Sequence, residues 1–421
     1  MGTTILNWYF ILFFDHATLL PTLMANIGQL DKVWQRRTKE AEETALNSNE
    51  SDPSIVTNSL NKEVHSNATM SSDIHLTSNS TRRYLKGKRY GGPCLATNPI
   101  DRCWRCQPNW HLNRKRLADC VLGFGYKTTG GKAGKFYVVT DNSDDSSRPK
   151  PRSLCHAVSQ KEPLWIIFAR SMNIRLTEEL IMQGDKIIDG RGAHANIIGG
   201  AGITIQSIKN VIIHNLHIRN IVSANGGNVI DAVDHIGFRT RSDGDGISIY
   251  GSSNVWIDHV SMSNCVEGLI DAIEGSTAIT ISNSYFTVML FEAHDSSSQD
   301  AILQITVAFN HFGKRLIQRM PRCRWGLFHI VNNDYTHWNM YAIGGSNHPT
   351  IISQGNRFIA PLNPRLKEIG AGSGRSGRER ERDRHRWMNK NQKLRTKQNK
   401  LGLGLGFGSP PPPKKEKKEK W

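Results

Sequence analysis

The chain has 421 residues, which is enough for one large domain or two ordinary ones with well-buried cores. Its formal net charge is +17, but residues 369–421 contain 16 Lys and Arg against 5 Asp and Glu, so 16 − 5 = +11 of this charge lies there. A nucleic-acid-binding function inferred from total charge would rest on this last segment, which has neither stacking aromatics nor a basic groove pattern.

The chain begins with an apolar segment, and we interpret residues 1–28 as a possible signal peptide. This segment is centred on the run from Trp8 to Phe14, and it is too short and too interrupted to span a membrane. Sequons for N-linked glycosylation begin at Asn49, Asn67 and Asn79. We therefore expect a secreted, extracellular protein without a membrane-spanning segment.

Residues 29–82 are polar and rich in Ser, Asn, Glu and Lys. A helix-like start near Leu30 fades into sequence of low hydrophobicity, which is typical of segments that cannot bury enough apolar surface to order themselves. We expect an extended, loosely ordered N-terminal arm here, followed by a compact domain over residues 83–368.

Seven cysteines occur in the chain, and four of them lie in the turn-rich stretch 94–120. In a secreted protein this spacing favours a small disulfide framework, whereas in the cytosol Cys103 and Cys106 could form a redox pair or half of a zinc site. Because the total is odd, at least one thiol must remain free.

From about residue 211 onward the pattern is a repeat rather than a set of amphipathic helices. Short apolar runs are each followed by an Asn or Asp at intervals of about two dozen residues, which is typical of the coils of a parallel β-helix. We expect stacked side chains at the marked positions, which are Asn215, Asp258, Asn283, Asn310, Asn333 and Asn356. An antiparallel β-sandwich is the competing fold, but few hairpin-type turns separate these runs.

A group of acidic residues, Asp243, Asp245, Glu267 and Asp271, spans two successive repeats. Glu267 and Asp271 share strand parity, and stacking of the coils would bring the other two nearby. Converging carboxylates must be protonated or metal-bound, and an all-oxygen ligand set favours Ca²⁺. The alternative is a set of ordinary turn aspartates with a solvated glutamate.

Two arginines, Arg319 and Arg324, follow in the sequence Arg-Met-Pro-Arg-Cys-Arg. Their odd offset would place them on opposite faces of a regular strand, but Pro321 interrupts the alternation between them. Arginine suits bidentate recognition of carboxylates. The alternative is a pair of surface arginines in an ion-pair network. Beyond them, residues 369–421 form a low-complexity segment that we expect to be a disordered basic tail.

Several long runs together resemble plant pectate lyases of the right-handed parallel β-helix superfamily. The matching runs are 92–106 (GPCLATNPIDRCWRC), 189–193 (DGRGA), 242–246 (SDGDG), 255–259 (VWIDH), 268–273 (GLIDAI), 318–324 (QRMPRCR), 331–335 (VNNDY) and 341–346 (YAIGGS). The resemblance covers residues 28–360, and residues 28–80 resemble the amino-terminal extension of some plant members. It implies an all-β, pectin-lyase-like solenoid.

The resemblance also implies an activity, namely calcium-dependent endo-cleavage of α-1,4-linked polygalacturonate by β-elimination, which leaves 4,5-unsaturated ends. It assigns Asp243 or Asp245, with Glu267 and Asp271, to Ca²⁺ binding. It further assigns Arg319 to removal of the C5 proton and Arg324 to the substrate carboxylate. Since arginine gives up its proton only at high pH, an alkaline pH optimum is expected.

Further implications concern disulfides and partners. The resemblance pairs Cys103 with Cys120 and Cys94 with Cys106, and it implies a monomer that acts on pectin of the plant cell wall, with no nucleic-acid or membrane partner. The alternative function is a catalytically impaired or non-catalytic pectin-binding β-helix protein. Relatives carry four more residues between Thr287 and Val288 and a different segment after the last coils.

Overall fold

The computed structural model describes residues 31–70, 94, 96–107, 109–286, 289–291, 297–314, 316–363 and 368–372. The expected signal peptide at 1–28 lies outside these residues, as does the basic tail beyond 372. Contacts divide the chain into residues 1–371 and 372–421, and the structure describes only Gly372 of the second unit. Within the described part of the chain, no helix is long and apolar enough to cross a membrane.

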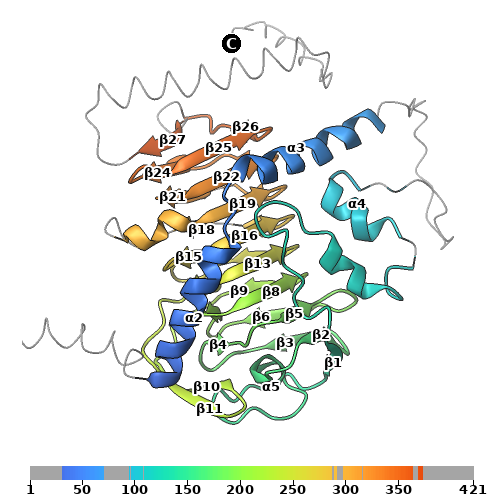
Figure 1. The fold of residues 1–421 in the computed structure, drawn as a ribbon, viewed down its shortest axis with the longest axis vertical. Helices are drawn as coiled ribbons and strands as arrows, with labels where there is room; N and C mark the ends of the chain where they lie inside the picture. The colour runs from blue at the N-terminus through green and yellow to red at the C-terminus, as the bar shows by residue number, and fades with distance from the viewer. Residues whose placement is uncertain are drawn as a thin grey trace, which may run out of the picture. The chain divides into compact units, whose positions relative to one another are not determined.

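Three parallel sheets form the body of the protein (Figure 1). Sheet A has the strand order β1 (Lys135–Val139), β2 (Leu164–Phe168), β5 (Lys186–Asp189), β8 (Lys209–His214), β13 (Ser253–Asp258), β16 (Thr277–Ser282), β19 (Gln304–Ala308), β22 (Leu327–Val331) and β25 (Thr350–Gln354). Sheet B has the order β3 (Met172–Ile174), β6 (Ala195–Ile198), β9 (His217–Arg219), β14 (Ser261–Ser263), β17 (Tyr285–Phe286), β20 (His311–Phe312), β23 (Asp334–Thr336) and β26 (Arg357–Ile359). Sheet C has the order β4 (Leu180–Ile181), β7 (Ile203–Gln206), β12 (Ile247–Tyr250), β15 (Ile270–Ile273), β18 (Met289–Phe291), β21 (Arg322–Arg324), β24 (Tyr341–Ser346) and β27 (Glu368–Gly372).

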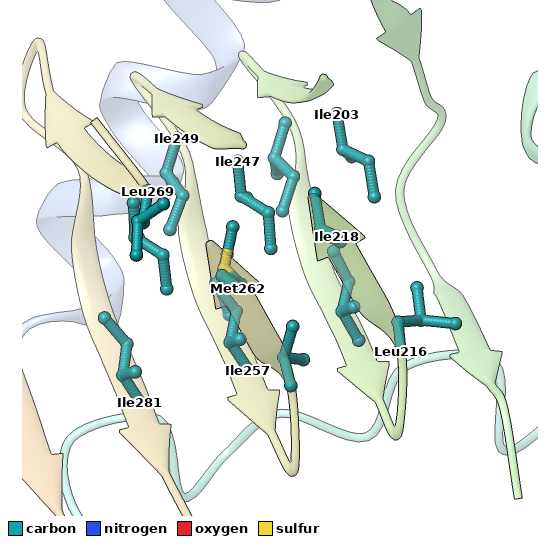
Figure 2. Close-up of a cluster of buried hydrophobic side chains, with 14 of the residues drawn as sticks. Ile203, Leu216, Ile218, Ile247, Ile249, Ile257, Met262, Leu269 and Ile281 are labelled. Carbon is teal, nitrogen blue, oxygen red and sulfur yellow. The ribbon is translucent and has the colours of Figure 1, made fainter. Parts of the chain in front are cut away.

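The chain passes from sheet A to sheet B to sheet C in each coil, and neighbouring coils pair strand on strand in parallel. This is the predicted parallel β-helix, and it excludes the antiparallel sandwich. Side chains of all three sheets point into one interior, as Figure 2 shows for Ile203, Ile218 and Ile257. Because every coil contributes apolar residues at the same register, the core is a continuous column rather than a central cluster.

A ladder of asparagines runs along the corner between sheets A and B, but only part of the predicted set belongs to it. Asn310 donates to Asn333 at 3.0 Å, and Asn333 donates to Asn356 at 3.0 Å, with 23 residues between successive members. In the preceding coil Ser284 takes the ladder position, where its backbone N–H donates to Asn310 Oδ1 at 3.0 Å. The column therefore satisfies buried turn backbone, as expected.

The prediction was wrong for Asn215, Asp258 and Asn283, which do not join this ladder. Asn215 and Asn283 lie one register position earlier and have backbone φ of 58° and 50°. Asparagine tolerates this left-handed conformation better than most residues, so the same residue type marks two different turn positions. Asp258 ends β13, and its carboxylate accepts from Ser282 and Asn283.

Replacing Asn333 by alanine is expected to lower the free energy of unfolding by about 1–3 kcal/mol. The buried Asn333 side chain accepts from Asn310 and donates to Asn356 and to the Val307 carbonyl at 2.8 Å. Urea unfolding would measure the loss. The control is Asn196→Ala, which removes a solvent-accessible hydrogen bond to Asn173. An equal cost for both variants would contradict the ladder's role.

The arm expected at residues 29–82 is not loosely ordered where the structure describes it. It forms α2 (Lys32–Ser48) and α3 (Pro53–Met70), which lie against the β-helix (Figure 1). Trp34, Ala41 and Ala45 are buried at helical spacing along α2. This stripe is narrow and alanine-rich, so it does not raise the overall hydrophobicity of the segment.

Polar contacts fix α2 along the edge between sheets C and A. Arg37 pairs with Asp231 at 2.8 Å, and Asn254 donates to Ser48 Oγ at 2.8 Å. Asn49, directly after the helix, donates its amide to the carbonyl of Ile302 at 2.8 Å. These hydrogen bonds and ion pairs add to the narrow apolar stripe, and hydrophobic periodicity cannot reveal them.

The remaining short elements cover other sides of the stack. They are α4 (Pro99–Arg105), a 3₁₀ helix η2 (Arg114–Asp119), α5 (Leu154–Ser159), the antiparallel hairpin of β10 (Gly227–Ala232) and β11 (His235–Arg239), and a 3₁₀ helix η3 (Ser298–Ile302). At the other end of the domain, β27 continues sheet C beside β24. The ordered body thus extends to residue 372, past the boundary expected at 368.

Candidate active site

The four predicted acidic residues lie on sheet C and on the loops that lead into it from sheet B. Asp271 is on β15, where it is in register with Ser248 of β12. Asp245 lies just before β12, and Glu267 lies just before β15. Asp243 is exposed, whereas Asp245 is buried. Stacking of successive coils therefore brings these residues together, as the sequence predicts.

Gly268 shows how closely two of these carboxylates converge. Its backbone N–H donates to Asp245 Oδ1 at 2.6 Å. A Cβ atom at this position would lie 2.6 Å from Asp271 Oδ1 and 2.8 Å from Asp245 Oδ1, so a side chain here would displace one or both carboxylates. Both oxygens therefore face the same small space beside residue 268, and glycine leaves that space open. Sequence analysis did not single out Gly268, although it lies inside the run 268–273.

The electrostatics of this pair fit a bound cation. Burial, opposed by the Gly268 N–H and assisted by the charges of Asp243 and Glu267, raises the pKa of Asp245 to about 6. Burial and the neighbouring Asp245 and Glu267 raise the pKa of Asp271 well above its ordinary value. Asp271 Oδ1 is buried and has no hydrogen-bond partner among the described residues. A hard divalent cation with oxygen ligands would remove all of these penalties.

Arg319 lies beside the acids. Its Nη1 is 3.7 Å from Glu267 Oε1, and its charge partly offsets the effect of burial on Asp271. The backbone of Arg319 has φ of 65°, a conformation that is strained for a residue with a side chain. It precedes the Met320–Pro321 peptide, where the regular strand pattern is interrupted. The structure thus brings Arg319 and the acids to one site.

Arg324 lies farther along the same sheet, together with a third arginine. Asp271 is in register with Leu290, and Leu290 with Arg322, so Arg322 continues the ladder of Asp271 two coils onward. Arg322 and Arg324 both donate to Ser346 Oγ, at 3.3 and 3.1 Å. Arg322 is not among the site residues predicted from the sequence, although its two-residue offset from Arg324 indicates that both side chains leave the same face.

Known proteins identify the family of the chain. A family model described as pectate lyase matches residues 175–369, and one described as the N terminus of pectate lyase matches residues 26–85. A probable pectate lyase from Solanum lycopersicum is 64% identical over 373 residues, covering 87% of this chain and 83% of the relative. A pectate lyase from Lilium longiflorum is 57% identical over 366 residues, covering 86% and 82%. The chain belongs to the pectate lyase family.

Among solved structures, the structure of this pectate lyase resembles that of Jun a 1, the major allergen from cedar pollen. The two share 45% sequence identity with a TM-score of 0.65, over 66% of this chain and 82% of the other. Thr287 and Val288, between which relatives are expected to carry four more residues, lie outside the described residues. Beside them, β18 still pairs with β15 and β21. The acids and the arginines therefore stay in register across this coil.

A second group of polar side chains comes together on another side of this pectate lyase. In the described part of the chain, only His214, Asp258 and His259 place three ligand-type atoms within 4.8 Å of one another, so the acids on sheet C are spaced more widely. Asp258 Oδ2 accepts from His214 at 2.9 Å and from His259 at 2.7 Å. His259 Nε2 also pairs with Asp101 of α4 at 3.1 Å. This group therefore joins α4 to the β-helix.

The remaining predicted residues are those of the disulfides and of the glycosylation sequons. The structure contains the Cys94–Cys106 and Cys103–Cys120 disulfides, the pairing that the resemblance implies. The other three cysteines of the chain are free. The Asn49 amide nitrogen donates to the Ile302 carbonyl, and its oxygen accepts from Thr277. The Asn67 side chain and Asn79 lie outside the described residues.

Proposed function

We propose that this pectate lyase cleaves α-1,4-linked polygalacturonate within the chain by calcium-dependent β-elimination and releases 4,5-unsaturated oligogalacturonides. The observation that carries this proposal is the convergence of Asp245 and Asp271 beside Gly268, with Arg319 next to them. Asp245, Asp271 and Glu267 would hold Ca²⁺, with Asp243 at the rim. Bound there, the cation would neutralise a uronate carboxylate and so acidify the adjacent C5–H.

The chain's own residues supply the remaining chemistry. Arg319 in its neutral form takes the proton from C5, and the C–H electron pair becomes the C4=C5 double bond. The C4–O bond breaks, and the leaving oxygen acquires a proton from water. Arg322 and Arg324, held by Ser346, offer planar donors to the substrate carboxylate. Since the neutral form of arginine becomes more abundant at high pH, the rate is expected to rise toward alkaline pH.

One assay tests this function. The full chain is incubated with polygalacturonate while the ultraviolet absorbance of unsaturated products is followed, with added Ca²⁺ and with a chelator. We expect product formation that stops on chelation and returns when Ca²⁺ is restored. Polymer binding without unsaturated product would favour the non-catalytic pectin-binding alternative. New reducing ends without absorbance would indicate hydrolysis and contradict the proposed reaction.

We infer further that the chain is secreted as a monomer into the plant cell wall, with glycans at Asn49, Asn67 and Asn79. The apolar segment at 1–28 and the sequons support this inference. Amino-terminal sequencing of protein recovered from the medium of expressing plant cells would test it. Retention of residues 1–28 in the mature protein would contradict the inferred signal peptide.

A further inference from the structure

A pocket of about 250 Å³ lies between the α4 segment and the corner that joins sheets A and B. The figure shows α4 at the side of the stack of strands (Figure 1). The pocket is lined by Trp104, Arg105, Trp110, Arg191, Gly192 and Asn215. Gly192 follows β5 and Asn215 follows β8, so both belong to turns from sheet A to sheet B. None of these residues belongs to the acid and arginine site on sheet C.

Two tryptophans and an arginine form a rigid wall. The Arg191 guanidinium carbon lies 5.1 Å from the ring centroids of both Trp104 and Trp110. Arg191 also donates through Nε and Nη2 to the two oxygens of Asp189, both at 2.8 Å. Arg114 shares the same carboxylate at 2.9 Å. The wall is therefore held in place before any ligand arrives, which lowers the entropic cost of binding.

The charges around the pocket sum to a positive excess. Arg114 and Arg191 have one buried partner, Asp189, between them. Burial opposes the charge of His259, but Asp258 and Asp101 outweigh it and raise the His259 pKa to about 10, so His259 is cationic at neutral pH. Of the pocket lining, Arg105 and Arg191 are charged, and the ion pairs that they belong to join four cations (Arg105, Arg114, Arg191 and His259) to three anions (Asp101, Asp189 and Asp258). His214 is fully buried, and burial lowers its pKa.

Trp104 lines the pocket, and its indole nitrogen is enclosed. Trp104 is only 8% exposed, and its Nε1 is buried with no hydrogen-bond partner among the described residues. Trp104 therefore contributes to the pocket wall through its ring. In the described part of the chain, the hydrogen bonds of Arg191 involve Nε and Nη2 but not Nη1.

We propose that this pocket binds a single carboxylate-bearing sugar, namely one galacturonate unit of the polymer, as an attachment point separate from the catalytic site. The carboxylate meets Arg105, and the C–H face of the sugar packs on the Trp110 ring. The volume is below the roughly 300–1,000 Å³ of sites for drug-sized ligands, which suits one ring. The identity of the polymer rests on the proposed function.

A second attachment point is expected to have a specific effect on the kinetics. Binding of one stretch of polymer at the pocket raises the effective concentration of the rest at the catalytic site. Loss of the pocket is therefore expected to raise KM for long polygalacturonate by about fivefold or more, with kcat unchanged. Kinetics on a trimer, which cannot reach both sites, should stay the same.

The test compares full-length parent protein with Arg105→Glu and Trp110→Ala. Each is titrated with galacturonate trimer in chelator, and tryptophan fluorescence is recorded with galactose as the neutral probe. The control is Arg148→Glu, the same charge reversal at an exposed arginine between β1 and α5, outside the pocket lining. We expect saturable trimer binding in parent and control, no response to galactose, and at least a tenfold weaker response in both pocket variants.

Three outcomes would overturn the proposal: no saturable binding in the parent, equal binding in both pocket variants, or equal binding of galactose. Arg105→Glu changes an exposed side chain, so it remains informative if Trp110→Ala fails to fold. If the proposed function is wrong, the assays give a different result from the three outcomes above. In that case unsaturated products are absent even with Ca²⁺, while the trimer still binds at the pocket.

Discussion

Replacing Arg319 by lysine lowers the rate of unsaturated-product formation by about 10²–10⁴-fold, the range expected for loss of a general base. Lysine keeps the positive charge and the contact with Glu267, which the structure places 3.7 Å from the guanidinium. It loses the planar fork that allows one nitrogen to face the substrate while another faces a carboxylate. Steady-state rates on polygalacturonate at saturating Ca²⁺ measure the loss.

Arg357→Lys is the matched control for Arg319→Lys. Arg357 also pairs with a single carboxylate, that of Asp334 at 2.5 Å, but it lies on β26 of sheet B and is largely exposed. We expect this variant to keep the activity of the parent. Thermal unfolding and Ca²⁺ titration of both variants separate a chemical loss from a folding loss. If Arg319→Lys retains more than about one tenth of the parent rate, Arg319 is not the base.

Replacing Asp271 by asparagine is expected to abolish stabilisation by Ca²⁺. A ligand present at about 100 times its dissociation constant stabilises a protein by about 2.7 kcal/mol. Asp271 and Asp245 face the same space beside Gly268, so removing one of these charges removes half of the buried acidic pair. Thermal unfolding with Ca²⁺ and with chelator measures the difference, which should fall close to zero in the variant.

The same substitution changes how stability depends on pH. The pKa of Asp271 in the folded protein is raised above its ordinary value of 3.8, mainly by burial. The folded state therefore holds this proton more tightly than the unfolded chain, and without Ca²⁺ the stability falls as pH rises from about 4 through the folded pKa. For Asp245, whose pKa rises from 3.8 to about 6, this loss is about 3 kcal/mol. Asp271→Asn should therefore be more stable than the parent in chelator at pH 8, and not at pH 4.

Asp300→Asn provides the matched control for this pH effect. Burial raises the pKa of Asp300 to about 6, and its Oδ1 accepts from the Gly275 N–H at 2.6 Å, as Asp245 does from Gly268. Asp300 is not one of the acids around Gly268. Its variant should weaken the pH dependence and keep the full response to Ca²⁺. Loss of the calcium response in Asp300→Asn, or its retention in Asp271→Asn, would contradict the assigned site.

Local sequence was sufficient for the repeat and for much of the site. The recurring apolar runs predicted the parallel coils, because each coil must bury its apolar residues against the next. Asp243 and Asp245 lie one repeat before Glu267 and Asp271, and stacking necessarily brings such residues together. The failure of Asn215 and Asn283 to join the ladder has a local cause. Asparagine is favoured both at the left-handed turn position and at the neighbouring ladder position, so residue type alone cannot distinguish the two.

The sequence by itself determined that the chain is a repeating β-helix with an acidic group in one pair of coils and arginines in a later one. Only the tertiary structure decided that Gly268 lies against two carboxylates, that Arg322 continues the ladder of Asp271, and that α2 packs on the solenoid. These features depend on contacts between residues far apart in the chain. A glycine's close approach to two carboxylates, or a helix held by a narrow apolar stripe and polar contacts, leaves little periodic signal in the segment that contains it.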